Sequence, residues 1–176
     1  MNNTKLPMDN SILRSDEELA FVMWLDEAIA KGIIIRYKYE PESFEVLPKA
    51  TYTIPPIGMA KVKKKHLLAN LSYTPDFYIY SEAELPYLKL PVIAKDGLFK
   101  YLIDVKGVFA KNGGHALFSV KQKIIYNKLG LYVNKVIPCK FFASSFVPMP
   151  ITLKDDVIWT NAPKRRLRSA YAKYQK

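Results

Sequence analysis

Two short phrases place acidic and basic side chains where they could meet. Asp76 lies in Tyr-Thr-Pro-Asp-Phe (73–77), and Asp104 and Lys106 lie in Ile-Asp-Val-Lys-Gly (103–107). Both phrases fall in runs rich in β-branched and aromatic residues. Because side chains alternate along a strand, Asp104 and Lys106 share a face, and a neighbouring strand can bring Asp76 beside them. The two carboxylates can hold a divalent metal through their oxygens, and the ammonium can lie next to an attacking water, which is an arrangement that cleaves phosphodiesters.

Simpler interpretations exist for each of these residues. Asp76 could be a strand-edge carboxylate after a proline, and Asp104 with Lys106 could be an ion pair on one face. His66 adjoins a lysine run and His115 a glycine loop, so surface roles are expected for both. Cys139 has no recognisable base partner and is expected to be a small buried residue. The tyrosines of the predicted strands could stack bases, with core packing as the default role: Tyr37, Tyr39, Tyr73, Tyr78 and Tyr80.

A helix is predicted over residues 15–31, with Ser15 as its N-cap and Gly32 after its end. Its apolar face carries Val22, Leu25 and Ile29, and Glu18 falls among them. A carboxylate that points inward is costly unless a partner satisfies it. Glu18 is therefore either the capping-box partner of Ser15 or a member of the acidic site, and both roles are compatible.

The strands that must position the two phrases are predicted at 73–80 and 99–106, after shorter extended runs at 33–40, 44–47 and 52–54. Between them, the insertion 81–98 is expected to form a hairpin or a loop beside the site. A helix is predicted over 115–129, with Leu117, Val120 and Ile124 buried. Its polar stripe could face the site or the substrate: Ser119, Gln122, Lys123 and Tyr126. A further strand is predicted at 131–137, and no clear period follows it.

Composition points to a basic single-domain protein. The chain has 176 residues, 49% of them hydrophobic, and 27 Lys and Arg against 16 Asp and Glu give a formal charge of +11. Polyanions are the expected partners, although solvated surface and targeting signals are alternatives for each basic cluster. With one cysteine and no apolar run of about 18 residues, we expect a soluble protein of a reducing, cytoplasmic compartment, in a bacterium or a phage-infected host.

The acid on the first helix, Pro-Asp on one strand, Asp-x-Lys on the next and the polar helix after it resemble the PD-(D/E)xK nuclease superfamily over roughly residues 15–137. The phrasing is most similar to small phage endonucleases, including the junction-resolving endonuclease I group. The resemblance implies an α/β fold with a restriction-endonuclease-like core, in which helices flank a central mixed sheet in the order αβββαβ. It also implies Mg²⁺ or Mn²⁺ as cofactor. The insertion 81–98 and an Asp at 104 in place of the commoner Glu depart from the family pattern.

The same resemblance assigns roles to residues. Asp76 and Asp104 are implied metal ligands with the Val105 carbonyl as a third, Lys106 orients or activates the water, and Glu18 completes the acidic cluster. Gln122 and Tyr126 are implied substrate contacts. Together with the basic clusters, the residues expected to contact nucleic acid are Lys61, Lys63, Lys64, Lys65, Lys121, Gln122, Tyr126, Arg165, Arg166 and Arg168.

These observations predict a metal-dependent DNA endonuclease of phage or mobile-element DNA processing. Its expected organisation is an N-terminal arm (1–14), a nuclease domain (15–150) and a basic C-terminal extension (151–176). Branched DNA is one candidate substrate, and resolution of a junction would need two sites and hence a homodimer. The alternatives are a non-catalytic basic protein that binds nucleic acid through a nuclease-like fold, and a protein-interaction domain that uses the aromatic surface after Phe141.

Overall fold

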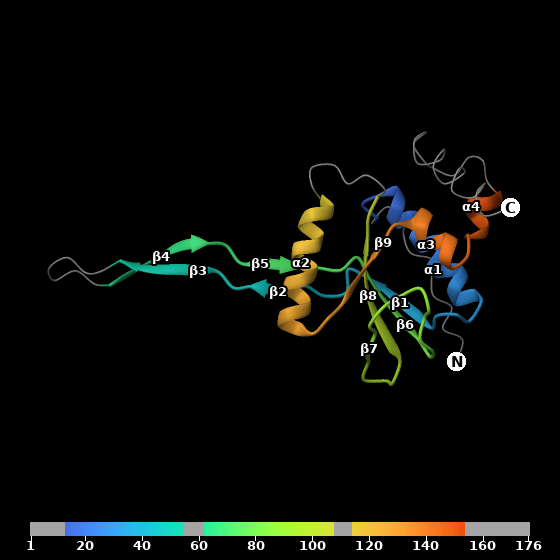
Figure 1. Cartoon of the computed structure of the whole chain (residues 1–176), viewed down its shortest axis with the longest axis horizontal. Helices are drawn as coiled ribbons and strands as arrows, with labels where there is room; N and C mark the ends of the chain where they lie inside the picture. Colours follow the sequence, from blue (N-terminus) through green and yellow to red (C-terminus); the bar gives the residue numbers. More distant parts are fainter. Residues whose placement is uncertain (1–12, 55–61, 108–113, 154–176) are drawn as a thin grey trace.

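A central mixed sheet of five strands organises the protein (Figure 1). The computed structural model describes residues 13–54, 62–107 and 114–153. The sheet contains β1 (Arg36–Tyr39), β6 (Phe77–Ser81), β8 (Phe99–Val105), β7 (Val92–Ile93) and β9 (Val133–Val136). β8 pairs along one side with β6 and along the other with β7 and then β9. Only the β8–β9 pairing is parallel, so the sheet is mixed.

One face of the sheet is covered by α1 (Asp16–Ala30), α3 (Pro138–Ser144) and α4 (Met149–Leu153). The helix α1 begins as predicted, because the Ser15 hydroxyl accepts a hydrogen bond from the Glu18 N–H at 3.2 Å. Trp24 of α1 is fully buried and lies edge-on to Phe141 of α3 with ring centroids 4.9 Å apart. These aromatic side chains pack on Ile79 and other residues of this face, and they form the larger of two hydrophobic clusters.

The opposite face is covered by α2 (Gly114–Leu129), which packs through Phe118 and Ile125 onto the second cluster. The prediction that Leu117 and Val120 are buried was wrong, because they are 59% and 54% exposed. Phe118 and Ile125 lie two turns apart and define the inward face instead. Between them, the Gln122 amide donates a hydrogen bond to the Val133 carbonyl at 2.6 Å, which joins the helix to β9.

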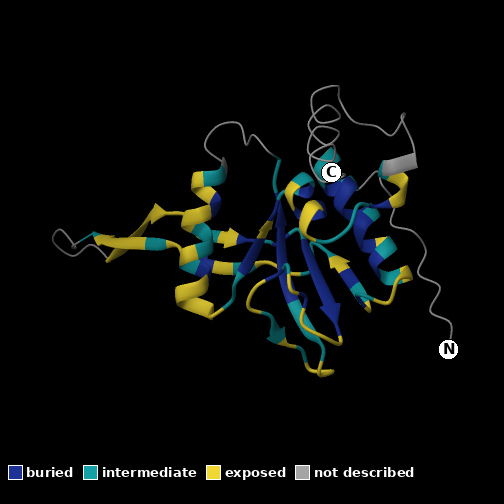
Figure 2. Cartoon of the chain, turned by 45° about the vertical axis from the view of Figure 1, so that its right-hand side comes forward, coloured by how far each residue is buried: buried dark blue, intermediate teal, exposed yellow. Residues whose placement is uncertain are grey.

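Two small antiparallel sheets extend from the body. β2 (Phe44–Leu47) pairs with β5 (Leu71–Tyr73), and β3 (Ala50–Ile54) pairs with β4 (Lys63–Leu68). In Figure 1 the β3–β4 ribbon projects well beyond the central sheet and its helices. Figure 2 shows that it is coloured mostly as exposed, whereas the central strands are buried. No strand was predicted at 63–68, because Lys-Lys-Lys-His-Leu-Leu has no polar and apolar alternation.

The insertion 81–98 does form a hairpin, but not beside Asp104. Its strand β7 pairs with Phe99 and Lys100, at the other end of β8. Asp104 lies four positions after Lys100, or about 13 Å along an extended chain. Asn134 of β9 fixes the segment before β7, since its side chain bonds both the N–H and the carbonyl of Lys89, at 2.8 and 3.0 Å.

The predicted α/β class with a central mixed sheet flanked by helices is confirmed. The sheet and its first flanking helices follow the chain order α1, β1, β6, β7, β8, α2, β9, in which β7 has only two residues. Most of the predicted N-terminal arm (1–14) and C-terminal extension (151–176) lies outside the described residues, as do Lys61, Arg165, Arg166 and Arg168. None of the described helices is long and apolar enough to cross a membrane.

Candidate active site

Asp76 and Asp104 meet at one end of the two most buried strands. Asp104 lies in β8, and Asp76 immediately precedes β6 and is not part of that strand, contrary to the prediction. The antiparallel register pairs Phe77 with Ile103, so the next position of each chain brings the two aspartates alongside. Asp76 Oδ2 accepts a hydrogen bond from the Val105 N–H at 2.6 Å. That bond fixes the Asp76 side chain against the end of β8.

Asp104 is 3% exposed, and its two carboxylate oxygens have different surroundings. Oδ1 accepts a hydrogen bond from the Tyr73 hydroxyl at 2.7 Å. Oδ2 forms an ion pair with the Lys106 ammonium, but within the described chain no donor approaches it at a hydrogen-bonding angle. Lys106 lies one residue beyond β8, and its Nζ also donates to the Val105 carbonyl at 3.2 Å. The Lys106 ammonium thus compensates the charge of this buried carboxylate.

The electrostatics of the pair favour an additional positive charge. Burial and, second to it, the nearby Asp104 carboxylate raise the pKa of Asp76, whose net value rises from 3.8 to about 7. The Lys106 ammonium and the Val105 N–H lower this pKa without cancelling the effect, while Glu18 adds a small increase. Burial and Asp104 also raise the pKa of the Tyr73 hydroxyl, which therefore stays protonated as a donor.

Glu18 reaches the same end of the sheet from α1 and is 7% exposed. Its Oε2 accepts hydrogen bonds from the Arg14 N–H and the Tyr39 hydroxyl, both at 3.0 Å. Ser15 caps the helix, but the Glu18 carboxylate binds the N–H of Arg14 instead of that of Ser15, so the capping box is one-sided. Of the groups that influence the pKa of Asp76, Glu18 has the smallest effect. It is therefore a neighbour of the aspartate pair, and its role as a metal ligand stays a prediction.

The donor set at the site suits a hard divalent cation. Asp76, Asp104 and the Val105 carbonyl offer oxygen ligands of the kind that Mg²⁺ and Mn²⁺ prefer. The described residues contain no group of three His, Cys, Asp or Glu side chains placed to hold a metal ion. The repulsion between the two buried aspartates fits a bound cation, whose other ligands would be the carbonyl and water.

The predicted nucleic-acid contacts are spread over several elements. Lys63, Lys64 and Lys65 are exposed on β4, with His66 beside them. On α2, Lys121 is half-buried, the Gln122 amide is occupied by the Val133 carbonyl, and Tyr126 is 48% exposed with its ring against Tyr132. Cys139 is a half-buried free thiol whose pKa is raised by burial, in keeping with a packing role.

Sequence reasoning missed Tyr73 and Tyr39, which hold the two acidic residues Asp104 and Glu18. Tyr73 stands three residues before Asp76 in the same phrase, and that proximity was the available signal. It ends β5, so the small β2–β5 sheet places its hydroxyl over Asp104. Tyr39 ends β1 and packs its ring against Phe77 at 5.2 Å.

We expect Tyr73→Phe to lower the free energy of unfolding by about 1 to 3 kcal/mol, because it leaves Asp104 Oδ1 buried without its donor. Urea denaturation monitored by circular dichroism measures this change. The matched control is Tyr126→Phe, which removes an exposed hydroxyl and should change stability by less than about 0.5 kcal/mol. Equal stability of the wild type and Tyr73→Phe would show that the hydroxyl does not support Asp104.

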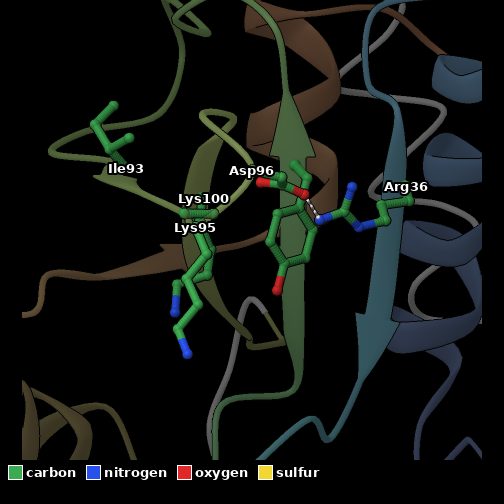
Figure 3. Close-up of a pocket in the computed structure, with 7 residues that line it drawn as sticks. Arg36, Ile93, Lys95, Asp96 and Lys100 are labelled. Carbon is green, nitrogen blue, oxygen red and sulfur yellow. Dashed lines mark hydrogen bonds and ion pairs between the residues drawn. The ribbon is translucent and has the colours of Figure 1, made fainter.

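A separate pocket of about 380 Å³ lies near the other end of β6 and β8. Figure 3 shows Arg36, Lys95, Asp96 and Lys100 around it. Asp96 forms an ion pair with Arg36, whose guanidinium carbon lies 4.1 Å from the centre of the Tyr80 ring. The carboxylate of this pocket is thus already neutralised, and the pocket shares no residue with the aspartate pair.

Comparisons of the chain with protein-family models, with curated proteins and with solved structures found no match. The likeness to the PD-(D/E)xK superfamily therefore depends on the motifs and on the geometry described above.

Proposed function

We propose that this protein is a metal-dependent DNA endonuclease of the PD-(D/E)xK type, with a restriction-endonuclease-like core. The observation that carries the proposal is the convergence of Asp76, Asp104 and Lys106 at the end of adjacent strands β6 and β8. Apart from the two-residue strand β7, the chain order of the central sheet and its flanking helices α1 and α2 supports the αβββαβ order of that superfamily. A net charge of +11 suits a polyanionic substrate.

The metal ligands and Lys106 have separate roles in the proposed hydrolysis of the phosphodiester. Asp76, Asp104 and the Val105 carbonyl would hold Mg²⁺ or Mn²⁺, which when bound supplies charge stabilisation at the phosphate and a more acidic water. Lys106 brings a fixed ammonium to the same place, where it opposes the negative charge that builds on the phosphate oxygens. Its contacts with Asp104 and the Val105 carbonyl restrict where that ammonium can lie.

The supporting residues keep the site in one arrangement. The Val105 N–H orients Asp76, and the Tyr73 hydroxyl orients Asp104. Both donors are part of the sheets themselves, so the aspartates are positioned by backbone pairing and by β5 and not by a mobile loop. Such fixed positioning is what metal-assisted hydrolysis requires of its ligands.

Cleavage of supercoiled plasmid by the purified protein tests this function. We expect nicked and linear products with Mg²⁺ or Mn²⁺ and none with EDTA, because the metal supplies most of the charge stabilisation. A panel of linear, flap and four-way-junction DNAs under the same conditions identifies the substrate form. Cleavage that continues unchanged in EDTA, or no cleavage of any DNA with either metal, would contradict the proposal.

A second candidate is a non-catalytic protein that binds nucleic acid through the same fold. It is favoured by the Lys106–Asp104 ion pair, which already compensates one of the two carboxylates. In that case DNA binding would be independent of divalent metal, and no substrate of the panel would be cut. The two candidates thus differ in one measurable outcome, the metal-dependent appearance of products.

A further inference from the structure

The β3–β4 ribbon lacks the property that usually explains a two-stranded sheet, an apolar face buried on the body. All six residues of β4 and the three central residues of β3 are exposed. A lone two-stranded ribbon is at best marginally stable in water, and an exposed one is expected to gain stability from a partner. Several of its exposed side chains are large and apolar, with Val62 59%, Leu67 58% and Leu68 63% exposed. Exposed apolar groups among charges are typical of an interaction surface.

The strand register distributes cations over both faces of the ribbon. Directly opposed residues of an antiparallel pair share a face. Tyr52 is opposite Lys65 and Ile54 is opposite Lys63, so these lysines occupy one face. Lys64, opposite Thr53, lies on the other face together with His66, opposite Thr51. The described ribbon residues, 50–54 and 62–68, include no Asp or Glu.

A partner that is negative on two sides fits this pattern. A membrane or a flat acidic surface can contact only one face of a ribbon, and it would favour cations on one face and apolar groups on the other. A DNA groove has a phosphate backbone on each side, and the major groove of B-DNA, about 12 Å wide, admits a two-stranded β-ribbon. Six residues of β4 span about 20 Å, or roughly six base pairs at 3.4 Å each.

We propose that the β3–β4 ribbon is a DNA-binding arm that enters the major groove of duplex DNA. Lys63, Lys65 and Lys64 contact the two phosphate backbones from opposite faces of the ribbon. This inference rests on the proposed function in taking DNA as the substrate, and it specifies duplex DNA and the element that holds it.

The arm is connected to the site by a short stretch of chain. Only Ala69 and Asn70 separate β4 from β5, and β5 ends at Tyr73, which binds Asp104. Lys65 and Tyr73 are eight positions apart, or about 26 Å of extended chain, so a duplex held by the arm can extend to the aspartate pair. The arm should determine how tightly DNA is bound, while the chemistry at saturating DNA should not depend on it.

The test is a triple variant, K63Q/K64Q/K65Q, measured by fluorescence anisotropy with a labelled duplex in EDTA over a range of salt concentrations. We expect affinity to fall roughly tenfold or more and the slope of log affinity against log salt to become shallower by about 2 to 3, because three phosphate contacts are lost. The matched control is K38Q/K89Q/K95Q, which removes the same charge from exposed positions on the body. We expect its slope to change by less than about 1. Circular dichroism verifies that both variants are folded.

A separate measurement tests whether the β3–β4 ribbon occupies the major groove. Duplex with glucosylated hydroxymethylcytosine, whose sugars crowd the major groove, should bind the wild type about as weakly as plain duplex binds the triple variant. Unchanged affinity of the wild type for this duplex would overturn the major-groove assignment. The arm proposal is also overturned if the triple variant keeps wild-type affinity and slope, or if it instead loses binding to phosphatidylserine vesicles or self-association.

The arm and the nuclease can fail separately. Duplex binding in EDTA needs no catalysis, so arm-dependent binding without any metal-dependent cleavage supports the arm and contradicts the nuclease. Metal-dependent cleavage with a triple variant that binds duplex normally supports the nuclease and contradicts the arm. If both hold, the triple variant should cut with a lower kcat/KM and a nearly unchanged kcat.

Discussion

Asp76→Asn is expected to reduce metal-dependent DNA cleavage by roughly a thousandfold or more, while duplex affinity in EDTA stays within about twofold of the wild type. The amide keeps an oxygen that can accept the Val105 N–H bond, so the end of β8 should stay in place. What is lost is a negatively charged ligand beside Asp104. Plasmid nicking under single-turnover conditions and fluorescence anisotropy with duplex DNA provide the two measurements.

The control for this substitution is Asp26→Asn on α1. Like Asp76, Asp26 accepts a hydrogen bond within the protein, from the Tyr37 hydroxyl at 2.8 Å, but it is exposed and lies outside the site. Its loss should leave cleavage unchanged. Full activity of Asp76→Asn would refute the site. Equal losses in both variants would point to a general effect of removing a carboxylate that accepts a hydrogen bond within the protein.

The second large effect is a pH-dependent loss of stability of the metal-free protein, which Asp76 causes. In EDTA, the wild type should lose about 2 to 3 kcal/mol of stability relative to Asp76→Asn between about pH 5 and pH 8. The pKa of Asp76 is about 7 in the folded protein and near 3.8 in the unfolded chain, so the folded state binds the proton more tightly. As pH rises between these values the unfolded chain releases its proton first, and stability falls until Asp76 is ionised in both states. Urea denaturation of both variants across this range gives the difference directly.

Divalent metal provides the control for the pH effect. A cation that binds the ionised pair lowers the pKa of Asp76, so added Mg²⁺ or Mn²⁺ should restore stability to the wild type at the alkaline end and do little for Asp76→Asn. If the stability difference between the wild type and Asp76→Asn does not change with pH, then folding does not raise the pKa of Asp76.

The sequence was most informative where one side-chain period dominates. The alternation around Asp104 located β8, and Ser15 located the start of α1. Asp76 was placed in a strand because hydrophobic residues follow it, but pairing with β8 begins only at Phe77. The position of Asp76 beside Asp104 was still predicted correctly, since antiparallel strands bring opposite positions together.

Prediction from the sequence was weakest where two patterns of apolar residues are equally plausible and only tertiary packing decides which of them is buried. The helix at 114–129 offers two apolar stripes, one with Leu117 and Val120 and one with Phe118 and Ile125. The sheet face selected the larger aromatic side chain of the second stripe. In the ribbon, the extended run 52–54 was predicted, but β4 was missed because its lysines follow no strand pattern and its pairing depends on residues 50–54, which are distant in the sequence. Tyr73 was assigned to packing because no sequence pattern marks the acceptor of a tyrosine hydroxyl.

The strand that carries Asp104 is flanked on both sides, by β6 along one edge and by β7 and β9 along the other. Amide protons of β8 can therefore exchange with solvent only when the whole sheet opens, while those of the outer elements exchange through smaller fluctuations. Small local openings of the outer elements therefore leave Asp76 and Asp104 side by side. A hydrolytic centre built on this strand would keep its shape until the protein as a whole unfolds.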